Sequence, residues 1–456
     1  DDLGFGGATS TAGEAKANGS RANAVDYTSV DVMGLDLGTS NLRLACTQGA
    51  SGQPCEVLEN ASGQRTTPIY LSFADADMSA PSPSPLLGAI AKSRRFADPK
   101  WTVAGGVLQQ LAFDGGSVEA EAVLSEGQKV SGEGGDDGPL LLELGGATDN
   151  PISIHSLYSA LVSEAVGIAS HKGLSLAAAP LSANSGSPLV LSVPVATPDS
   201  ARNFLVNVCL EQGLMVYGVV DDASAAYVAA MDAGILTDML KNGSSQSQSQ
   251  IMVVDLGGSL VQASLLSAGD GGGSLGGGSR VEVVQTVASR TTGSNQLHAA
   301  LVDHLALQFA LRNGIDLRQD YMSMERLHSA AEVAAEELSF RPKVKINLPF
   351  ITADASGPKH LEESLTRAEY ARILDDALGA MTQPIADVLA KAGVRPGSEP
   401  SELAGVLLVG AGARSPALQA AVQARVGAGV VTVVPPNPEE YVARGAAKAP
   451  EYGWLE

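Results

Sequence analysis

The sequence repeats one short pattern at two widely separated places. In each copy an apolar run predicts a strand, and the run ends in Asp-Leu-Gly, at residues 36–38 and again at residues 255–257. Glycine and hydroxyl residues follow, and in such a turn backbone N–H groups can approach an anion closely. The carboxylate can hold a hydrated cation beside bound phosphates. A single copy is equally typical of a plain strand turn, but two copies predict two similar α/β lobes that face each other across a cleft.

The remaining patterns alternate between strands and helices. Hairpins are expected at 32–46, 130–150 and 251–266, and further strands at 69–73, 189–195, 216–220, 344–350, 405–409 and 430–434. Helices are expected at 152–171, 200–213, 223–231, 296–339, 365–392, 416–426 and 441–447. This order predicts a first lobe over residues 31–235 and a second over residues 251–450.

Three segments are predicted to lie outside the lobes or on their surface. Residues 1–30 are rich in Gly, Ala, Ser and Thr without periodicity, which is typical of a flexible tail. Residues 242–250 are a polar linker, and residues 269–279 form a glycine-rich loop.

Composition excludes several classes of protein. The net charge is -21, with 29 Lys plus Arg against 50 Asp plus Glu, so direct nucleic-acid binding is not expected. The 3 cysteines contain no CxxC pair, which argues against a disulfide framework or a zinc site. No apolar run reaches the length of a membrane span, roughly 18–20 residues. A cytoplasmic location is the simplest expectation, and an organelle lumen reached after removal of a targeting peptide stays open.

A third glycine turn at residues 410–412 follows a predicted buried strand and suits contact with an adenosine. No Walker P-loop, GxxxxGK[ST], occurs. The ordered motifs together resemble the DnaK-type (70-kDa heat-shock) chaperones over about residues 32–450. They include GLDLGTSN at 34–41, ENASGQRTTP at 59–68, LGAIAK at 87–92 and NPEE at 437–440. The resemblance implies an actin-like ATPase fold, with two lobes around a nucleotide cleft, each built from a βββαβα-type core and a smaller subdomain.

The resemblance also implies a site for ATP or ADP with magnesium. Asp36 and Asp255 would neighbour the metal ion, and Lys92, Thr39 and a degenerate Asp222 would be catalytic. A solvated surface lysine is the plainer interpretation of Lys92. Contacts to the nucleotide would come from Gly38, Thr39, Ser40, Asn41, Gly257, Gly258, Ser259, Gly293, Glu332, Ser339, Gly410, Ala411 and Arg414.

Several positions depart from the family pattern. Asp222 stands where the family has a glutamate, and the proline next to it is absent. In the second turn, Leu260 replaces a threonine and Gln262 replaces an aspartate. Ala335 and Glu336 replace the lysine and arginine of the adenosine helix, and the loss of the arginine removes a cation–π contact to the base. These changes predict impaired hydrolysis and weaker nucleotide binding.

The family's substrate-binding domain is expected to be absent, since no part of the printed sequence resembles it. The favoured interpretation is a non-canonical chaperone homologue, similar to the Ssz-type members of the ribosome-associated complex. Such a protein would act as a scaffold or co-chaperone with a J-domain-type partner and would reach the ribosome through that partner. A slow genuine ATPase and a structural subunit of a ribosomal, organellar or ciliary assembly stay open.

Overall fold

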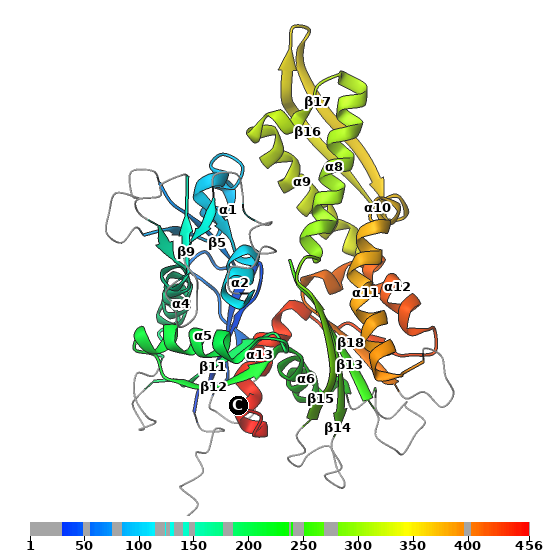
Figure 1. The fold of residues 1–456 in the computed structure, drawn as a ribbon. Coiled ribbons are helices and arrows are strands. Elements are labelled where there is room, and N and C mark those ends of the chain that lie inside the picture. Colours follow the sequence, from blue (N-terminus) through cyan, green and yellow to red (C-terminus); the bar gives the residue numbers. More distant parts are fainter. Residues whose placement is uncertain are drawn as a thin grey trace, which may run out of the picture.

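The computed structural model describes residues 30–48, 55–74, 84–114, 124, 128–131, 140–145, 151–176, 186–236, 239, 250–268, 281–395 and 403–455. The predicted tail, linker and glycine-rich loop lie outside these residues, apart from Val30 and Gln250 at their ends. Two lobes stand side by side, and an elongated subdomain extends from the second (Figure 1). The predicted boundaries of the lobes at 31–235 and 251–450 stay predictions.

The sheet of the first lobe has the strand order β12-β11-β1-β2-β3, with β4 also paired to β2. Its strands are β1 (Met33–Leu37), β2 (Asn41–Cys46), β3 (Glu56–Val57), β4 (Thr67–Pro68), β11 (Leu189–Val193) and β12 (Val216–Asp221). β1 pairs antiparallel with β2 and parallel with β11. The first Asp-Leu-Gly motif ends β1 and begins the short turn to β2, so this turn lies at one end of the inner strands of the sheet.

The sheet of the second lobe has the corresponding order β19-β18-β13-β14-β15. Its strands are β13 (Gln250–Leu256), β14 (Val261–Ala268), β15 (Val281–Ser289), β18 (Leu403–Val409) and β19 (Thr432–Val433). β13 pairs antiparallel with β14 and parallel with β18, as β1 does with β2 and β11. The expectation of two similar α/β lobes in an actin-like arrangement is therefore confirmed.

Helices pack aliphatic cores against both sheets. They are α4 (Ile154–His171) and α5 (Asp199–Glu211) in the first lobe, and α11 (Asp375–Ala392) and α12 (Pro416–Val426) in the second. The smaller subdomains contain α1 (Ala89–Arg94), α2 (Gly105–Asp114), α8 (Ser294–Asn313), α9 (Tyr321–Phe340) and α10 (Arg367–Ile373). Their strands are β5 (Tyr70–Ser72), β6 (Leu86–Leu87), β7 (Thr102–Ala104), β8 (Lys129–Ser131), β9 (Leu141–Glu143), β10 (Ile152–Ser153), β16 (Lys343–Asp354) and β17 (Gly357–Thr366). Short 3-10 turns occupy Pro99–Trp101, Leu317–Gln319, Ala411–Arg414, Pro438–Glu440 and Ala449–Tyr452.

Two helices join the lobes at their base. α6 (Asp222–Asp232) and α13 (Tyr441–Lys448) pack against each other between the two sheets (Figure 1). A Cβ on Gly445 would lie 1.7 Å from the carbonyl oxygen of Ala225, and a Cβ on Gly34 would lie 2.3 Å from that of Ala443. Although α13 lies within the range predicted for the second lobe, it covers β1 and β2 of the first.

Most predicted elements are present, but α1, α2, β15, β17 and the short strands β3, β4, β6, β7 and β10 were not predicted. The helices predicted at 296–339 and 365–392 are each divided in two, the first after α8 at Gly314 and the second between α10 and α11 at Leu374. β17 is a strand of an exposed two-stranded ribbon and contains several charged side chains. Its hydrophobic pattern in the sequence is therefore weak. Among the described helices, none combines the length and the hydrophobicity needed to cross a membrane.

Candidate nucleotide-binding cleft

The two Asp-Leu-Gly turns meet between the lobes. The backbone amide of Ser259 donates a hydrogen bond to Oγ1 of Thr39 at 3.0 Å. Nδ2 of Asn295, in the first turn of α8, donates to Oγ of Ser40 at 3.0 Å and to Oγ of Ser259 at 3.1 Å. A Cβ on Gly258 would lie 1.8 Å from Oγ of Ser40, so only glycine permits this approach. The hydroxyls predicted to face phosphates thus also connect the lobes.

A small pocket of about 60 Å³ lies beside these turns. Four carboxylates line it: Asp36 near the end of β1, Asp255 near the end of β13, Asp222 at the start of α6, and Glu439 in the turn before α13. The predicted residues that line it are Asp36, Gly38, Thr39, Ser40, Asn41, Asp222, Asp255, Gly257, Gly258, Gly410 and Ala411. The fold therefore brings most of the predicted phosphate and metal residues together.

Burial and mutual repulsion raise the pKa values of the three aspartate carboxyl groups. Burial raises the pKa of Asp36 to about 6, although the Arg43 charge opposes the shift. Burial and the Asp36 charge raise the pKa of Asp255 to about 7. The pKa of Asp222 is raised well above its ordinary value by burial and by the neighbouring aspartates. Its Oδ1 is buried and has no hydrogen-bond partner among the described residues.

Arg43 is a functional candidate that the sequence analysis missed. It lies opposite Asp36 in the β1–β2 register and forms an ion pair with it at 3.6 Å. The two side chains are only 10% and 11% exposed. A signal was present in the sequence, because Arg43 interrupts an otherwise apolar strand and falls on the same face as Asn41.

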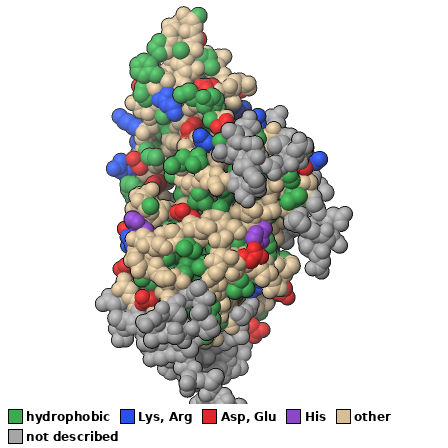
Figure 2. All heavy atoms as spheres, turned by 90° about the vertical axis from the view of Figure 1, so that its left-hand side faces the viewer, with side chains coloured by type: hydrophobic (Ala, Val, Ile, Leu, Met, Phe, Trp, Pro, Cys, Tyr) green, Lys and Arg blue, Asp and Glu red, His purple; other side chains and the backbone are tan. Residues whose placement is uncertain are grey.

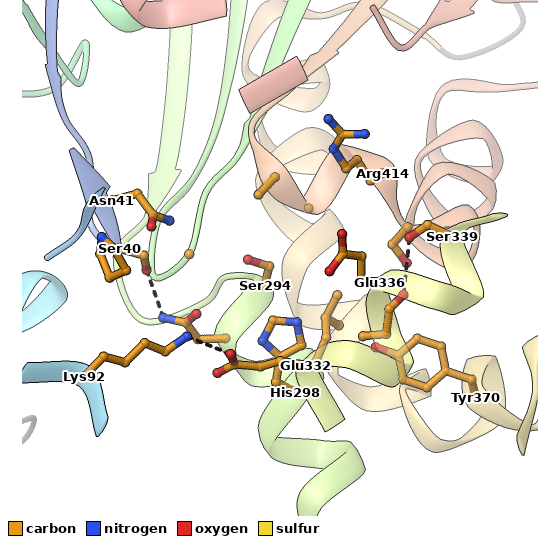
Figure 3. A pocket seen from close by; sticks show the side chains of 18 of the residues that line it. Ser40, Asn41, Lys92, Ser294, His298, Glu332, Glu336, Ser339, Tyr370 and Arg414 are labelled. Carbon is orange, nitrogen blue, oxygen red and sulfur yellow. Dashed lines mark hydrogen bonds and ion pairs between the residues drawn. The ribbon is translucent and has the colours of Figure 1, made fainter. Parts of the chain in front are cut away.

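A larger pocket of about 320 Å³ continues from the small one, since Ser40, Asn41, Gly258 and Ala411 line both. Its far side is formed by α9, α10 and the turn after β18 (Figure 3). The predicted residues that line only this pocket are Lys92, Glu332, Ser339 and Arg414. A neighbouring pocket holds Ser259 and Gly293 beside Thr39.

Arg414 is held at the mouth of the larger pocket by Glu439 and Asn437. Its Nη2 donates to Oε1 of Glu439 at 2.7 Å and to Oδ1 of Asn437 at 3.0 Å. Glu336 also lines the pocket and contributes a negative charge that, with Glu439, raises the pKa of Arg414. Tyr370, which the sequence analysis did not single out, adds a buried aromatic side chain (Figure 3).

Lys92 lies away from the carboxylates of the small pocket. Its Nζ forms an ion pair with Oε2 of Glu332 at 2.6 Å, and Arg95 approaches the other oxygen of Glu332 at 3.5 Å (Figure 3). Among the described residues that line the small pocket, none is a lysine. The contact bridges α1 and α9 across the cleft, so the catalytic role of Lys92 stays a prediction that this placement does not favour.

The sequence model of the Hsp70 protein family matches residues 32–111 and 177–450. These segments include both phosphate turns, the glycine turn after β18, and α13. The chain belongs to the Hsp70 family. Family membership suggests a chaperone-type function, since Hsp70 proteins generally bind ATP or ADP with magnesium and typically work with J-domain co-chaperones. The expected resemblance to this family is confirmed, whereas the Ssz-type subgroup stays a prediction.

Two residues that depart from the Hsp70 pattern, Leu260 and Gln262, lie at the second phosphate turn and on the strand that follows it. Leu260 is buried and lines the small pocket, where the family has a threonine. Gln262 is also buried, and its Oε1 accepts a hydrogen bond from the backbone amide of Val195 at 3.0 Å. Its amide therefore serves a contact between the lobes and brings no charge toward the pocket.

The side chains of this cleft do not fit the magnesium ion of the family well. In a nucleotide site, Mg²⁺ is held by phosphate oxygens and waters together with one or two carboxylates, whose charge must be available to the ion. Here Asp36 already pairs with a buried arginine, and Gln262 replaces a carboxylate. The described residues contain no group of three or more His, Cys, Asp or Glu that could hold a metal ion. The nucleotide pocket thus fits the family better than the metal site does.

Proposed function

We propose that this chain is an Hsp70 homologue that binds ATP or ADP as a structural ligand, hydrolyses it poorly or not at all, and acts as a scaffold or co-chaperone. The observation that carries the proposal is the side-chain set of the small pocket. Leu260 is apolar, Asp222 is buried with an unpaired oxygen, and no lysine of the described residues lines the pocket. This set offers little to orient or activate a water molecule.

The binding half of the proposal rests on the continuous cleft. A pocket of about 320 Å³ falls within the range of small-molecule sites, roughly 300–1,000 Å³. Ser339, Tyr370 and Arg414 surround the part that would hold the nucleoside, and the two glycine turns offer backbone N–H groups to phosphates. Glu336 places a negative charge where the family has a base-stacking arginine, so affinity should be lower than in typical members.

The hydrolysis half rests on the burial of Asp222. Burial and the neighbouring aspartates raise the pKa of this carboxyl group well above its ordinary value, so they disfavour its charged form. The charged form is the one that accepts a proton from an attacking water. The shorter Asp222 in place of a glutamate adds a displacement of ~1 Å, which is enough to weaken positioning strongly.

A J-domain-type partner agrees with membership of the Hsp70 family and with the impaired ATP hydrolysis proposed here. Catalytically weak family members of the Ssz type form a complex with such a partner, and ribosome association would then pass through it. The net charge of -21 favours a basic partner surface. On the face seen in Figure 2, the described Lys and Arg side chains lie mostly in the upper half and stand apart from one another.

Two measurements test the proposal. Thermal unfolding in the presence of ATP or ADP should show a raised Tm, because a ligand that binds only the native state stabilises it. Single-turnover incubation with labelled ATP should then leave the bound nucleotide intact over hours. Repeated turnover would identify a slow ATPase instead, and an unchanged Tm would point to a structural subunit without a nucleotide role. Copurification with a J-domain protein tests the partner, and a monomer that never copurifies with one would count against it.

A further inference from the structure

The buried arginine beside the phosphate turns has no role in the function proposed above. Arg43 occupies β2, opposite Asp36, and its side chain is nearly as buried as the carboxylate with which it pairs. Burial of a positive charge costs free energy unless the charge is paired. The surrounding negative charges must therefore offset the cost of burying the Arg43 guanidinium group. Arg43 lines the same small pocket as Asp222, Asp255 and Glu439. The guanidinium therefore stands among the carboxylates at the phosphate end of the cleft.

A guanidinium and a divalent ion compete for the same place. Both neutralise carboxylates, and two positive charges a few ångströms apart repel each other strongly in a buried site. The guanidinium is permanently charged and has five N–H donors in a planar fork. Such a fork suits phosphate oxygens, which it binds with two parallel hydrogen bonds. A guanidinium group and a divalent metal ion can therefore both neutralise the phosphates, the first through hydrogen bonds and the second through coordination.

The rest of the pocket favours the guanidinium. Asp36 pairs with Arg43, and Gln262 turns its amide oxygen to the backbone of Val195. The site retains negative charge that needs a counter-ion and includes a fixed cation that provides it.

We infer that Arg43 is the built-in counter-cation of this cleft, so that the polyphosphate of a nucleotide binds here without a divalent metal ion. The inference rests on the proposed nucleotide binding and adds that Arg43 takes over the neutralising role of magnesium. It assigns a binding role to a residue of β2 rather than a step in hydrolysis.

Calorimetric titration of ADP tests the inference in magnesium and in EDTA. The unaltered protein should bind ADP with Kd values that agree within about two-fold in the two buffers. Arg43→Gln keeps a polar side chain of similar reach but removes the charge, and it should bind about ten-fold more weakly in EDTA than in magnesium. Arg43→Lys keeps the charge and should behave like the unaltered protein. A ten-fold loss of affinity of the unaltered protein in EDTA would overturn the inference.

A second measurement needs no nucleotide. Binding of Mn²⁺ to the free protein, followed by electron paramagnetic resonance, should show no uptake at the carboxylates of the unaltered protein and one bound ion in Arg43→Gln. Arg312→Gln is a matched control, because Arg312 is an exposed arginine that pairs with Glu363 away from the cleft. Uptake of Mn²⁺ by the unaltered protein that Asp36→Asn abolishes would contradict the inference.

The two measurements separate the inference from the function on which it rests. If no variant binds ADP, the proposed nucleotide binding fails, and the Mn²⁺ titration still decides what occupies the carboxylates. If Arg43→Gln does not fold, the unaltered protein and Arg43→Lys still decide whether a metal ion is required.

Discussion

The backbone amide of Ser259 and the side-chain oxygen of Thr39, 3.0 Å apart, connect the two phosphate turns directly. One residue belongs to the first lobe and the other to the second, so the hydrogen bond closes the cleft at its narrow end. The same two turns are expected to hold phosphates. Closure of the cleft and nucleotide binding therefore depend on the same atoms.

Thr39→Val should weaken this closure. Valine keeps the shape of threonine but cannot accept a hydrogen bond, so the amide of Ser259 loses its partner. The free energy of unfolding should fall by about 1 kcal/mol, as measured by urea denaturation. Thr39→Ser retains the hydroxyl and should stay within about 0.5 kcal/mol of the unaltered protein. Equal losses in both variants would show that packing of the methyl group, rather than the hydrogen bond, matters here.

Lys92→Ala should speed nucleotide release. The Lys92–Glu332 ion pair bridges α1 and α9 over the larger pocket, and both side chains are partly exposed, so its loss should cost less than about 1 kcal/mol. That corresponds to release about two- to five-fold faster, measured by stopped-flow displacement of fluorescent ADP. Lys172→Ala breaks a comparable ion pair with Glu59 away from the cleft and should leave release unchanged. If Lys92→Ala abolished measurable single-turnover hydrolysis without altering release, the catalytic role of Lys92 would be supported instead.

Asp255→Asn should stabilise the protein at high pH. The pKa of Asp255 is raised to about 7, above its value in the unfolded chain, so the folded state binds more protons between these two values. The free energy of unfolding contributed by this group therefore falls as pH rises from about 4 to about 7 and stays low above that. The asparagine side chain does not ionise, so Asp255→Asn avoids this loss of stability. Its free energy of unfolding should exceed that of the unaltered protein by on the order of 1–3 kcal/mol at pH 8 and by much less at pH 5.

The control for Asp255→Asn is Asp376→Asn, because Asp376 is exposed in the first turn of α11. Its effect on thermal unfolding should be small and similar at pH 5 and pH 8. If Asp255→Asn were destabilised equally at pH 5 and pH 8, the carboxylate of Asp255 would make a contact that the fold requires.

Gly445→Ala should separate α13 from α6. The added Cβ would lie 1.7 Å from the carbonyl oxygen of Ala225, and backbone on both sides leaves no room for relaxation. We expect a loss of about 3 kcal/mol or more in the free energy of unfolding. Gly167→Ala changes a glycine in α4 with nothing within 4 Å of the new atom, so it should stabilise by about 0.5–1 kcal/mol. Similar small effects in both variants would contradict close packing of α13 on α6.

The fold could be predicted because its determinants are local and repeated. The two hairpins at β1–β2 and β13–β14 have continuous apolar strands and short glycine turns, which leave few alternatives. β17 could not be predicted, because an exposed ribbon in which Lys359, His360 and Glu362 interrupt the alternation has little hydrophobic periodicity. The return of α13 to the first lobe depends on contacts between residues about 400 positions apart, and the hydrophobic pattern does not encode such contacts.

The site could be predicted as a group of residues but not as a set of partners. The glycine turns marked the phosphate end, because backbone conformation and residue type coincide there. The partners of long side chains are set by distant elements, so the sequence did not show that Lys92 pairs with Glu332, 240 positions away. Arg43 was missed because a basic residue in a strand reads as solvent-exposed until the register places it beside Asp36.

The position of α13 also bears on how the chain is made. The strands that it covers, β1 and β2, are complete by residue 46, whereas α13 itself begins at Tyr441. At roughly 5–20 residues per second, this face of the first lobe waits about 20–80 s for its cover during synthesis. Throughout that interval the nascent chain exposes the surface around Gly34 that Ala443 will later contact. A member of a chaperone family would therefore be, during its own synthesis, a candidate for protection by other chaperones.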